Sequence, residues 1–551
     1  MPNNGEALDV SLSATLPRRQ VVLTMAGVML AIFLASLDQT IVSTAMPRII
    51  TDLGGLDRFT WVVTAYLVAS TTAVPIVGKL SDIYGRKSFY IVGIAVFLTG
   101  SVLAGQSQTM NQLIAFRAVQ GLGGGVMMAI ALVSIADLFP PSERGKYQGM
   151  VAAVFGLSSI IGPTLGGFIT DALSWHWIFY VNLPLGVPII AVFIRWFPNV
   201  RPARSERHID FIGMALLVLA VVPLLVGMSW GGVQYGWASP QVILALSVSA
   251  AAAVALVFVE LRVADPIMPL SIYRDRVVSV SLLVIFLTGF GMFGGILFIP
   301  LFFQGVLGAS ATSSGSFLTP MMLGIVVGAA SSGQALSRFG GHYRIQGLVA
   351  LSIMCAGMFL ISLMSHETSY ARATLNIVVM GIGLGMTFPV YTIAVQNAVS
   401  HDVVGAATSA TQFYRSIGGT LGLAVLGSVM TNRFVAAIDG AIPESVTSAV
   451  PPETIARLKD NPQALINPEA TAALEASLSR LGPDGAATAE RLLQALRESL
   501  ASAIGDVFTV ALAVLVLAFA ATLLLRELPL PGRAASPRQA TPPAREAGDG
   551  D

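Results

Sequence analysis

The sequence predicts an all-α membrane protein whose chain crosses the bilayer fourteen times. Of its 551 residues, 54% are hydrophobic and 11% are charged, whereas roughly 25% are charged in an ordinary soluble domain. Apolar stretches long enough to span a hydrocarbon core about 30 Å thick recur from Val21 to Leu525. The first of them, VVLTMAGVMLAIFLASL, lacks the alternation of a barrel strand. Composition and pattern therefore exclude a water-soluble protein and an outer-membrane barrel.

The spans and their orientation follow from the apolar runs and the charges that flank them. The fourteen runs cover about residues 21–45, 60–77, 88–106, 110–136, 147–170, 177–197, 211–230, 241–261, 277–303, 315–335, 345–364, 373–399, 404–431 and 504–525. An even number of spans places both termini on one side. The connections on that side hold twenty Lys and Arg, whereas the short connections on the other side hold only Arg48, Arg58 and Arg372. By the positive-inside rule, we expect both termini in the cytoplasm and the protein in the cytoplasmic (inner) membrane.

Several classes of function find no support in the sequence. A net charge of +1 argues against nucleic acid as a partner. No GxxxxGKS or GxxxxGKT loop is present, so ATP hydrolysis is not the expected energy source. The five histidines are scattered without an HExxH motif or clustered carboxylates, which predicts neither a metal site nor an enzyme.

An internal repeat divides the chain into two six-span halves. Three segments of the first half have partly similar copies, or echoes, in the second half. These copies occur in the same order and at offsets of 255, 256 and 260 residues. The pairs are GKLSDIYGRK at 78–87 with GQALSRFGGH at 333–342, GPTLGG at 162–167 with GGTLGL at 418–423, and RAVQGLG at 117–123 with IVVMGIG at 377–383. Repeats of this kind build transporters whose halves move about a central site.

The expected domains follow from this repeat. They are a cytoplasmic tail at 1–17, an N-terminal six-helix bundle at 18–200, two inserted transmembrane helices at 201–265, a C-terminal six-helix bundle at 266–527 and a cytoplasmic tail at 528–551. The composition of both tails predicts disorder. Within the second bundle, Ala/Leu/Glu/Arg-rich segments predict an extracytoplasmic helical hairpin at 432–503. This hairpin is a solvated connector, a lid on the outer vestibule or a docking surface for a periplasmic adaptor.

Six motifs occur in order along the chain. They are LDQTIVSTAMP at 37–47, GKLSDIYGRK at 78–87, RAVQGLG at 117–123, GLSSIIGPTLGG at 156–167, WHWIFYVNLPLG at 175–186 and PLFFQGVLGASATSSG at 300–315. Together they resemble the major facilitator superfamily, and within it the fourteen-span drug/proton antiporter branch of multidrug efflux proteins. The resemblance covers nearly the whole chain apart from the tails and the outer hairpin.

This resemblance implies a major facilitator fold of two pseudo-repeated six-helix bundles plus two inserted helices. It implies export of amphipathic drugs or other small molecules by alternating access, in exchange for protons and with no cofactor beyond the proton gradient. Export of an endogenous lipid, siderophore or amino acid on the same fold is the alternative. The expected partners are the transported molecule, protons, membrane lipid and the candidate periplasmic adaptor, and the protein is expected to be a monomer.

Two intramembrane charges are predicted to meet. Asp38 lies about 25 Å beyond the cytoplasmic start of the first span, and Arg117 lies about seven residues below the outer start of the fourth. Both therefore lie about 10 Å beneath the outer surface. Pairing lowers the cost of burying them, and separation of the pair would favour proton uptake by the carboxylate. The pair is either a permanent salt bridge or, as the resemblance implies, part of proton or substrate coupling.

The segment 78–87 is expected to form a tight cytoplasmic turn between the second and third spans. Gly78 and Gly85 permit close helix approach and unusual backbone angles there. The resemblance implies that Asp82 and Arg86 form a cytoplasmic gate with Asp137 of the fourth span. Such a gate would hold the outward-facing state.

The fifth span carries the glycine-rich segment that the resemblance associates with antiporters. Its marked residues are Gly156, Gly162, Pro163, Gly166 and Gly167. Small residues let membrane helices approach closely, and proline bends a helix. Both a packing role and a dynamic role are open.

Arg415 is a charged residue near the middle of the thirteenth span, about 15 Å from its start. A guanidinium at that depth needs a carboxylate, carbonyls or a water-filled cavity. We expect it to line a cavity, in substrate binding or in tuning proton coupling, or else to be a structural cap. The residues expected around it are Gln412, Gln396, Asn397, Tyr391 and Phe388. The aromatic members would suit bulky cations, although packing against lipid is the more common role of such residues.

Overall fold

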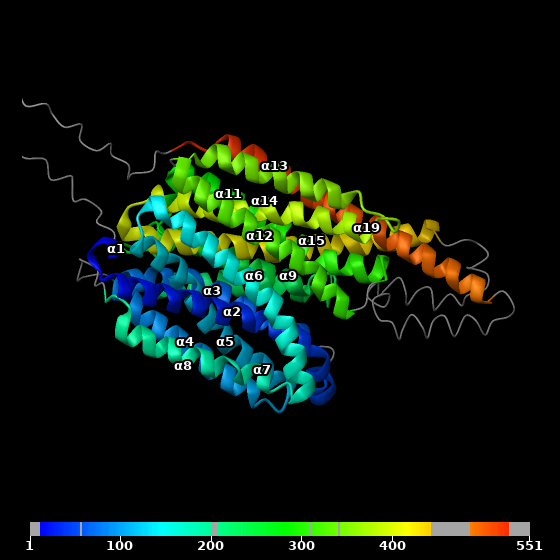
Figure 1. The fold of residues 1–551 in the computed structure, drawn as a ribbon, viewed down its shortest axis with the longest axis horizontal. Helices are drawn as coiled ribbons and strands as arrows, with labels where there is room; N and C mark the ends of the chain where they lie inside the picture. The colour runs from blue at the N-terminus through cyan, green and yellow to red at the C-terminus, as the bar shows by residue number, and fades with distance from the viewer. Residues whose placement is uncertain are drawn as a thin grey trace, which may run out of the picture.

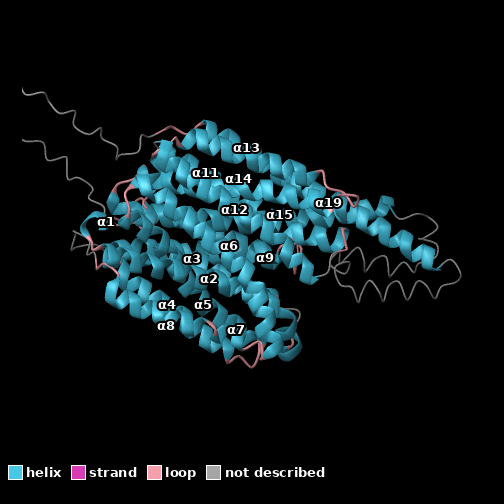
Figure 2. Ribbon diagram, viewed as in Figure 1, coloured by secondary structure: helices cyan, strands magenta, loops and turns pink. Residues whose placement is uncertain are grey.

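The computed structural model describes residues 12–55, 58–199, 208–232, 234–308, 311–339, 342–441 and 485–527. These residues form helices joined by short connections, with one isolated β-bridge between Gly231 and Tyr235 (Figures 1 and 2). Thirteen of the described helices are long and apolar enough to cross a membrane. The all-helical membrane fold predicted from the sequence is confirmed.

The first group of helices, blue to cyan in Figure 1, precedes residue 200. It consists of α1 (Leu12–Thr15), α2 (Arg18–Leu53), α3 (Thr60–Tyr84), α4 (Arg86–Gly105), α5 (Met110–Leu138), α6 (Pro141–Ala172), α7 (Trp177–Tyr180) and α8 (Asn182–Trp196). The sequence predicts disorder through residue 17, whereas α1 forms one helical turn. The reason is apolar contact, because Leu12 and Leu16 pack against the buried core of this group.

Two inserted helices and a second group complete the chain. They are α9 (Phe211–Trp230) and α10 (Pro240–Glu260), followed by η1 (Leu270–Arg274), α11 (Arg276–Leu301), η2 (Phe302–Val306), α12 (Ala311–Phe339), α13 (Tyr343–Ser362), α14 (Tyr370–Asn397), η3 (His401–Val403), α15 (Val404–Ala441) and α19 (Gly485–Leu523). The second group has its own continuous apolar core. The two halves are therefore two packed bodies, each held together by its own buried side chains.

Helix α12 corresponds to the span predicted at 315–335. With 29 residues it is long enough to cross a membrane, and glycine, serine and threonine are frequent along it. Its position explains this composition, since it packs between α6 of the first half and α14 of the second. A helix covered on two sides by protein needs less apolar surface for lipid.

The last two helices extend well beyond the predicted spans. Helix α15 continues to Ala441, and α19 begins at Gly485 and runs without a break to Leu523. The rest of the predicted hairpin, residues 442–484, lies outside the described residues, as do residues 1–11 and 528–551 of the tails.

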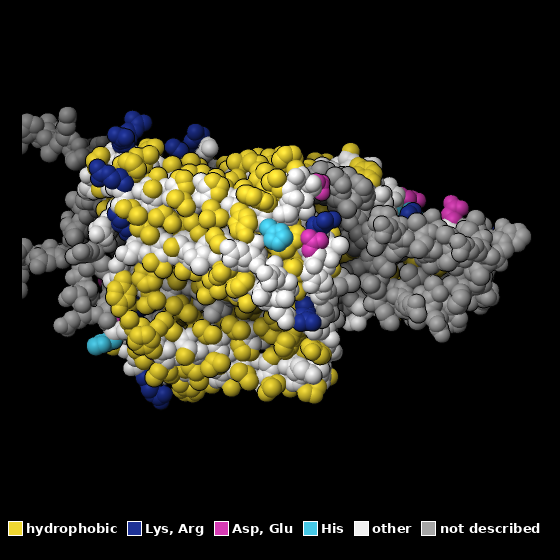
Figure 3. Space-filling model, turned by 90° about the horizontal axis from the view of Figure 1, so that it is seen from below, with side chains coloured by type: hydrophobic (Ala, Val, Ile, Leu, Met, Phe, Trp, Pro, Cys, Tyr) yellow, Lys and Arg dark blue, Asp and Glu magenta, His cyan; other side chains and the backbone are white. Residues whose placement is uncertain are grey.

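The two ends of the bundle differ in what they carry. The described ends of the chain, where α1 begins and where α19 ends, lie at the left in Figure 1, and we call this the terminal end. The end of α15 and the start of α19 lie at the right, and we call this the hairpin end. Figure 3 shows apolar side chains over the flank of the molecule between these ends, with several Lys and Arg gathered toward the terminal end. This distribution fits a protein that crosses a membrane along its long axis.

The two halves meet mainly through α6 with α12 and α3 with α15. Near the terminal end, the backbones of Gly145 and Gly333 touch, so that a Cβ on either would overlap the other. One turn further along, a Cβ on Gly149 would lie 2.9 Å from the Cα of Ala330. The absence of side chains therefore sets how closely α6 and α12 approach.

The inserted helices lie against this junction. Helix α9 packs on both α3 and α15, and a small apolar cluster that includes Val74, Val221 and Phe413 joins the three helices. Helix α10 packs on α9 and leaves most of its own apolar surface exposed. The insertion therefore covers one side of the contact between the halves.

Gly149→Leu is expected to lower the free energy of unfolding by about 1–3 kcal/mol, because the added side chain must displace the α12 backbone. Gly167→Leu is the matched control, since it places the same side chain on the same helix where nothing lies within 4 Å of an added Cβ. Thermal unfolding of the purified protein in detergent measures the difference. Equal stability of the two variants would show that the contact between α6 and α12 does not depend on Gly149.

Candidate functional site

Asp38 of α2 and Arg117 of α5 form an ion pair inside the first half. The Arg117 Nη1 to Asp38 Oδ2 distance is 2.5 Å. Neither residue is exposed by more than 1% of its surface. The pairing that equal depth in the membrane predicts is therefore present.

Three further side chains complete the network around the carboxylate. Gln120 and Asn182 donate from Nε2 and Nδ2 to Asp38 Oδ1, at 2.8 and 2.9 Å. The same two amide nitrogens donate to Ser101 Oγ, at 3.1 and 2.9 Å. Gln120 Oε1 accepts from Arg117 Nη1 at 2.7 Å. Asp38 is thus held by one cation and two amides from two other helices, α5 and α8, and Ser101 of α4 links the amides.

Close helix contacts create the space for this network. A Cβ on Gly100 of α4 would lie 2.5 Å from the backbone nitrogen of Gln120, and one on Gly121 of α5 would lie 2.8 Å from the Cα of Tyr66. The Tyr66 ring of α3 consequently lies against the guanidinium, 4.5 Å from the Arg117 Cζ to the ring centroid. Such a cation–π contact stabilises a desolvated arginine.

Sequence reasoning did not identify Ser101, Asn182, Gln120 or Tyr66 as members of this site. Asn182 did carry a signal, because it is an amide within an otherwise apolar stretch of the motif at 175–186. Ser101 and Tyr66 carried none, since buried serines and tyrosines are common in membrane helices.

The predicted gate residues also come together, at the terminal end. Arg86 forms ion pairs with Asp82 and with Asp137, the latter at 3.0 Å from Nε to Oδ2. Gly85, with a φ of 93°, ends α3 and precedes α4, and this left-handed backbone favours glycine. Gly78 faces Ser409 of α15, where a larger residue would overlap the hydroxyl.

Asp82 makes a contact with the second half that the sequence did not predict. Its Oδ2 accepts a hydrogen bond from the backbone nitrogen of Ala406 at 3.1 Å, in the first turn of α15. The start of a helix favours a carboxylate, because its free N–H groups and its dipole both attract negative charge. Asp82 therefore joins Arg86 of the first half to α15 of the second.

Asn397 lies in a second contact between the halves, not beside Arg415 as the sequence predicts. Its Oδ1 accepts from Arg144 Nη1 of α6 at 3.2 Å, and its amide nitrogen donates to the Tyr343 hydroxyl. Arg144 also donates to the carbonyls of Ala136 and Phe139. The placement follows from helix length, because Asn397 lies nine residues, about 13 Å, beyond Phe388 along α14.

The marked residues of α6 divide between two neighbours. Gly156 faces α12, where an added Cβ would lie 2.6 Å from Val326 Cγ2. Gly162 and Gly166 face Thr40 and Thr44 of α2, and α6 continues through Pro163 without a break. Gly167 meets nothing within 4 Å. Packing accounts for three of the four glycines and gives no reason for Gly167.

Arg415 is buried in the second half, with 5% of its surface exposed. Its Cζ lies 4.0 Å from the centroid of the Phe388 ring, as expected for that pair. Its Nε has no hydrogen-bond partner within the described part of the chain. Arg415 therefore retains one buried donor.

Two more of the residues predicted around Arg415 point elsewhere. The Tyr391 hydroxyl lies 2.8 Å from that of Thr522 in α19, and Gln396 donates to Thr408 at 3.2 Å. Nearness in sequence did not indicate nearness in space, because α14 directs successive side chains toward α11, α12, α13 or α15. Gln412 is partly buried on α15.

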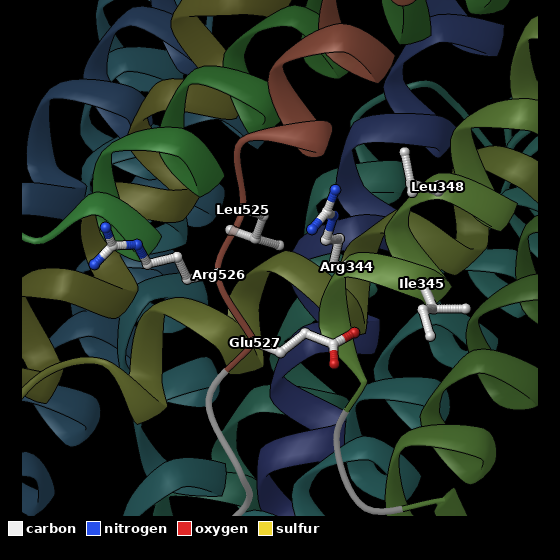
Figure 4. A pocket seen from close by; sticks show the side chains of 6 residues that line it. All are labelled: Arg344, Ile345, Leu348, Leu525, Arg526 and Glu527. Carbon is white, nitrogen blue, oxygen red and sulfur yellow. The ribbon is translucent and has the colours of Figure 1, made fainter.

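A depression of about 730 Å³ lies at the terminal end, away from these groups (Figure 4). It is lined by Arg344, Ile345, Leu348, Leu525, Arg526 and Glu527. None of these residues contacts the Asp38 network or Arg415, so the depression is not the candidate site. Among the described residues, no group of three His, Cys, Asp or Glu could hold a metal ion.

Comparison with known proteins gives consistent matches. A family model described as Major Facilitator Superfamily matches residues 28–423. The multidrug transporter protein MdtP of Bacillus subtilis (strain 168) is 36% identical over 529 residues, which cover 94% of this chain and 95% of that protein. Multidrug resistance protein 3 of the same organism is 41% identical over 415 residues, or 75% of this chain and 80% of that protein.

Solved structures share the fold. The human organic anion transporter MFSD10 (TETRAN) matches with a TM-score of 0.58 at 15% identity, covering 91% of this chain and 100% of that chain. The proton:xylose symporter XylE matches with a TM-score of 0.56 at 14% identity, covering 76% and 90%.

Asp82→Asn is expected to loosen the contact between the halves at the terminal end. The amide keeps an acceptor for Ala406 but loses the charge, which weakens the bond by about 1 kcal/mol, roughly fivefold in the equilibrium. Thiol labelling of Ser409→Cys, in a background with Cys355→Ser, reports the opening, because Ser409 is buried against Gly78.

The control is Asp137→Asn, which removes a partner of Arg86 and leaves the Asp82 to Ala406 bond in place. We expect it to raise labelling less than Asp82→Asn does. Unchanged labelling in Asp82→Asn would leave the segment 78–87 with only a role in membrane orientation.

Proposed function

The chain belongs to the major facilitator superfamily, and from its buried carboxylate network we propose that it is a proton-coupled exporter. The exported molecules are amphipathic drugs or other small molecules. The energy source is the proton gradient, with no cofactor. The protein works as a monomer in the cytoplasmic membrane, with both termini in the cytoplasm.

The buried Asp38 carboxylate is the observation that carries this proposal. A carboxylate enclosed in an apolar bundle is costly, and such groups commonly mark proton or ion paths. Within the described part of the chain, Asp38 has one compensating cation and no second carboxylate among its contacts. Protonation would remove the attraction to Arg117, so the strength of that pair would depend on whether a proton is bound.

The contacts at the terminal end correspond to one of the two states that alternating access requires. Asp82 with Ala406 and Arg144 with Asn397 hold the halves together there. With the terminal end in the cytoplasm, as the positive-inside rule predicts, this arrangement is closed toward the cytoplasm, as an outward-facing state requires. A proton from outside would then reach Asp38 before the halves rearrange.

A continuous set of contacts leads from Asp38 to the junction of the halves. Next to Asp38 on α2, Ser36 lies 2.5 Å from Ser158 of α6, hydroxyl to hydroxyl, and Thr40 lies against Gly162. Helix α6 in turn touches α12 through Gly145, Gly149 and Gly156. We propose that movement of α2 on protonation shifts α6 and thereby weakens the contacts at the terminal end.

The candidate substrate region surrounds Arg415 in the second half. Arg415 offers an unpaired Nε donor beside the Phe388 ring, a combination that suits a molecule with an acceptor group and an aromatic or apolar body. Multidrug relatives support export of such molecules. Export of an endogenous lipid, siderophore or amino acid would use the same groups.

The direct test is transport by the purified protein in liposomes under an imposed pH gradient. Cationic, neutral and anionic amphipathic compounds are compared with an amino acid and a lipid analogue. Movement of a compound against its gradient, which stops when a protonophore collapses the pH gradient, supports the proposal. Equal movement with and without the gradient contradicts proton coupling.

Asp38→Asn is expected to reduce proton-driven transport to the rate of empty vesicles, because the amide has nearly the same shape but cannot take up and release a proton. Transport is measured in liposomes, and folding is checked by the elution profile and the thermal midpoint. The variant should still fold, since the amide oxygen can accept from Arg117, but the thermal midpoint should fall because the charge that compensates Arg117 is lost.

Asp52→Asn is the matched control, because Asp52 is a carboxylate of the same helix that pairs with Arg48 at the surface. We expect transport at the unmodified rate in this variant. Proton-driven transport at the unmodified rate in Asp38→Asn would overturn the coupling role of Asp38.

A further inference from the structure

The Asn182 side chain has one unused polar atom in the centre of the Asp38 network. Its Nδ2 donates twice, to Asp38 Oδ1 and to Ser101 Oγ, both at 2.9 Å. Its Oδ1 is buried and has no hydrogen-bond partner within the described residues, and the residue as a whole is 0% exposed. A buried amide normally uses both its donors and its acceptor, so this orphan oxygen requires an explanation.

The present hydrogen bonds fit an ionised Asp38. Each carboxylate oxygen accepts only, Oδ2 from Arg117 and Oδ1 from Gln120 and Asn182. Ser101 accepts from both amides and donates its own proton to the Phe179 carbonyl at 2.8 Å. Nothing in this arrangement accepts a proton from Asp38.

A protonated Asp38 requires a different arrangement. A proton taken from water and bound to Oδ1 would point at two amide N–H groups, which are donors. Gln120 cannot present its oxygen instead, because that oxygen holds Arg117 at 2.7 Å. Asn182 can present its oxygen, because that oxygen has no other partner among the described residues and the oxygen and NH2 group of the amide are nearly equal in size.

We propose that Asn182 turns its side-chain amide when Asp38 binds a proton, so that its orphan Oδ1 accepts the new O–H. The inference rests on the proposed function, since it concerns the same carboxylate. Ser101 can follow by turning its hydroxyl toward the amide, because the Phe179 carbonyl retains a backbone donor at Val181. Asn182 is thus a positioning residue whose side-chain amide has one hydrogen-bonding pattern for ionised Asp38 and another for protonated Asp38.

The other groups around Asp38 do not supply this acceptor. Arg117 from α5 is a donor, and Tyr66 from α3 lies with its ring against that guanidinium. Helix α4 contributes Ser101, α7 contributes the Phe179 carbonyl, and α6 contributes Ser158, which contacts Ser36. The Arg117 and Tyr66 side chains are the charged and titratable groups that contact the network among the described residues. Arg117 cannot accept a hydrogen bond, and the Tyr66 hydroxyl, which can, lies against Gly124 of α5 and makes no hydrogen bond to Asp38.

Infrared difference spectra of the purified transporter, recorded on acidification, test the turn directly. We expect a protonated-carboxyl band that is lost in Asp38→Asn, accompanied by a side-chain amide change that is lost in Asn182→Leu. Asn376→Leu is the matched control, because Asn376 is also buried and donates to the Leu360 carbonyl in the other half. That variant should keep both signals.

The pH profile of transport gives a second readout. Asn182→Leu removes a donor to the ionised carboxylate and an acceptor for the protonated one, and the bond to the charged form is the stronger. The transport midpoint should therefore move to higher pH by about one unit, a tenfold change in proton affinity. Ser101→Ala removes the hydroxyl that pairs with the Asn182 amide in both patterns. It should also move the midpoint, and it serves if Asn182→Leu does not fold.

The outcomes separate this inference from the proposed function. An amide change that persists in Asn182→Leu, or a midpoint that moves in neither Asn182→Leu nor Ser101→Ala, overturns the turn of Asn182 while Asp38 keeps its role. A carboxyl band that persists in Asp38→Asn shows that another group takes the proton and contradicts the proposed function itself.

Discussion

The charge of Asp38 inside an apolar bundle is the constraint on which the first half of the molecule depends. Moving a single charge into hydrocarbon costs at least about 2.5–3.5 kcal/mol at a helix centre. Compensation requires Arg117, two amides and a hydroxyl from three other helices at hydrogen-bond distance. That requirement explains why α4 and α3 approach α5 at glycines, since any larger residue would separate the groups. The glycine contacts that pack the helices of this bundle are therefore the same contacts that bring the polar groups to Asp38.

The second half retains the helices of the repeat without this chemistry. Where the first half has Asp82 and Arg117, the second has Ser337 and Ile377 in the corresponding echoes. Its contribution at the junction is instead made by uncharged groups, namely the Ala406 N–H, the Gly333 backbone and the Asn397 side-chain amide. One half thus carries the titratable groups, and the other supplies the surface against which they act.

The sequence was sufficient to predict the helices and those contacts that follow from the charge of a residue and its depth in the membrane. The Asp38–Arg117 pair could be predicted because opposite charges at equal depth in a membrane must meet. The Ala406 contact could not, because a backbone N–H carries no mark in the sequence. Asn397 and Tyr391 were assigned to the wrong neighbours, since residues close in sequence face different helices when α14 packs on several partners. Asn182 lies within the motif at 175–186, but only the structure shows that its side-chain oxygen has no hydrogen-bond partner among the described residues.

Helices α15 and α19 are long enough for their far ends to move much more than the rest of the second half when that half rotates. With 38 and 39 residues, these helices are roughly 57 Å long, about twice the thickness of the hydrocarbon core. Figure 1 shows α19 projecting beyond the rest of the bundle at the hairpin end. Because both helices are rigidly packed in the second half, any rotation of that half is amplified at their tips. A label placed there would register a small tilt as a displacement of several ångströms, far from the groups that cause it.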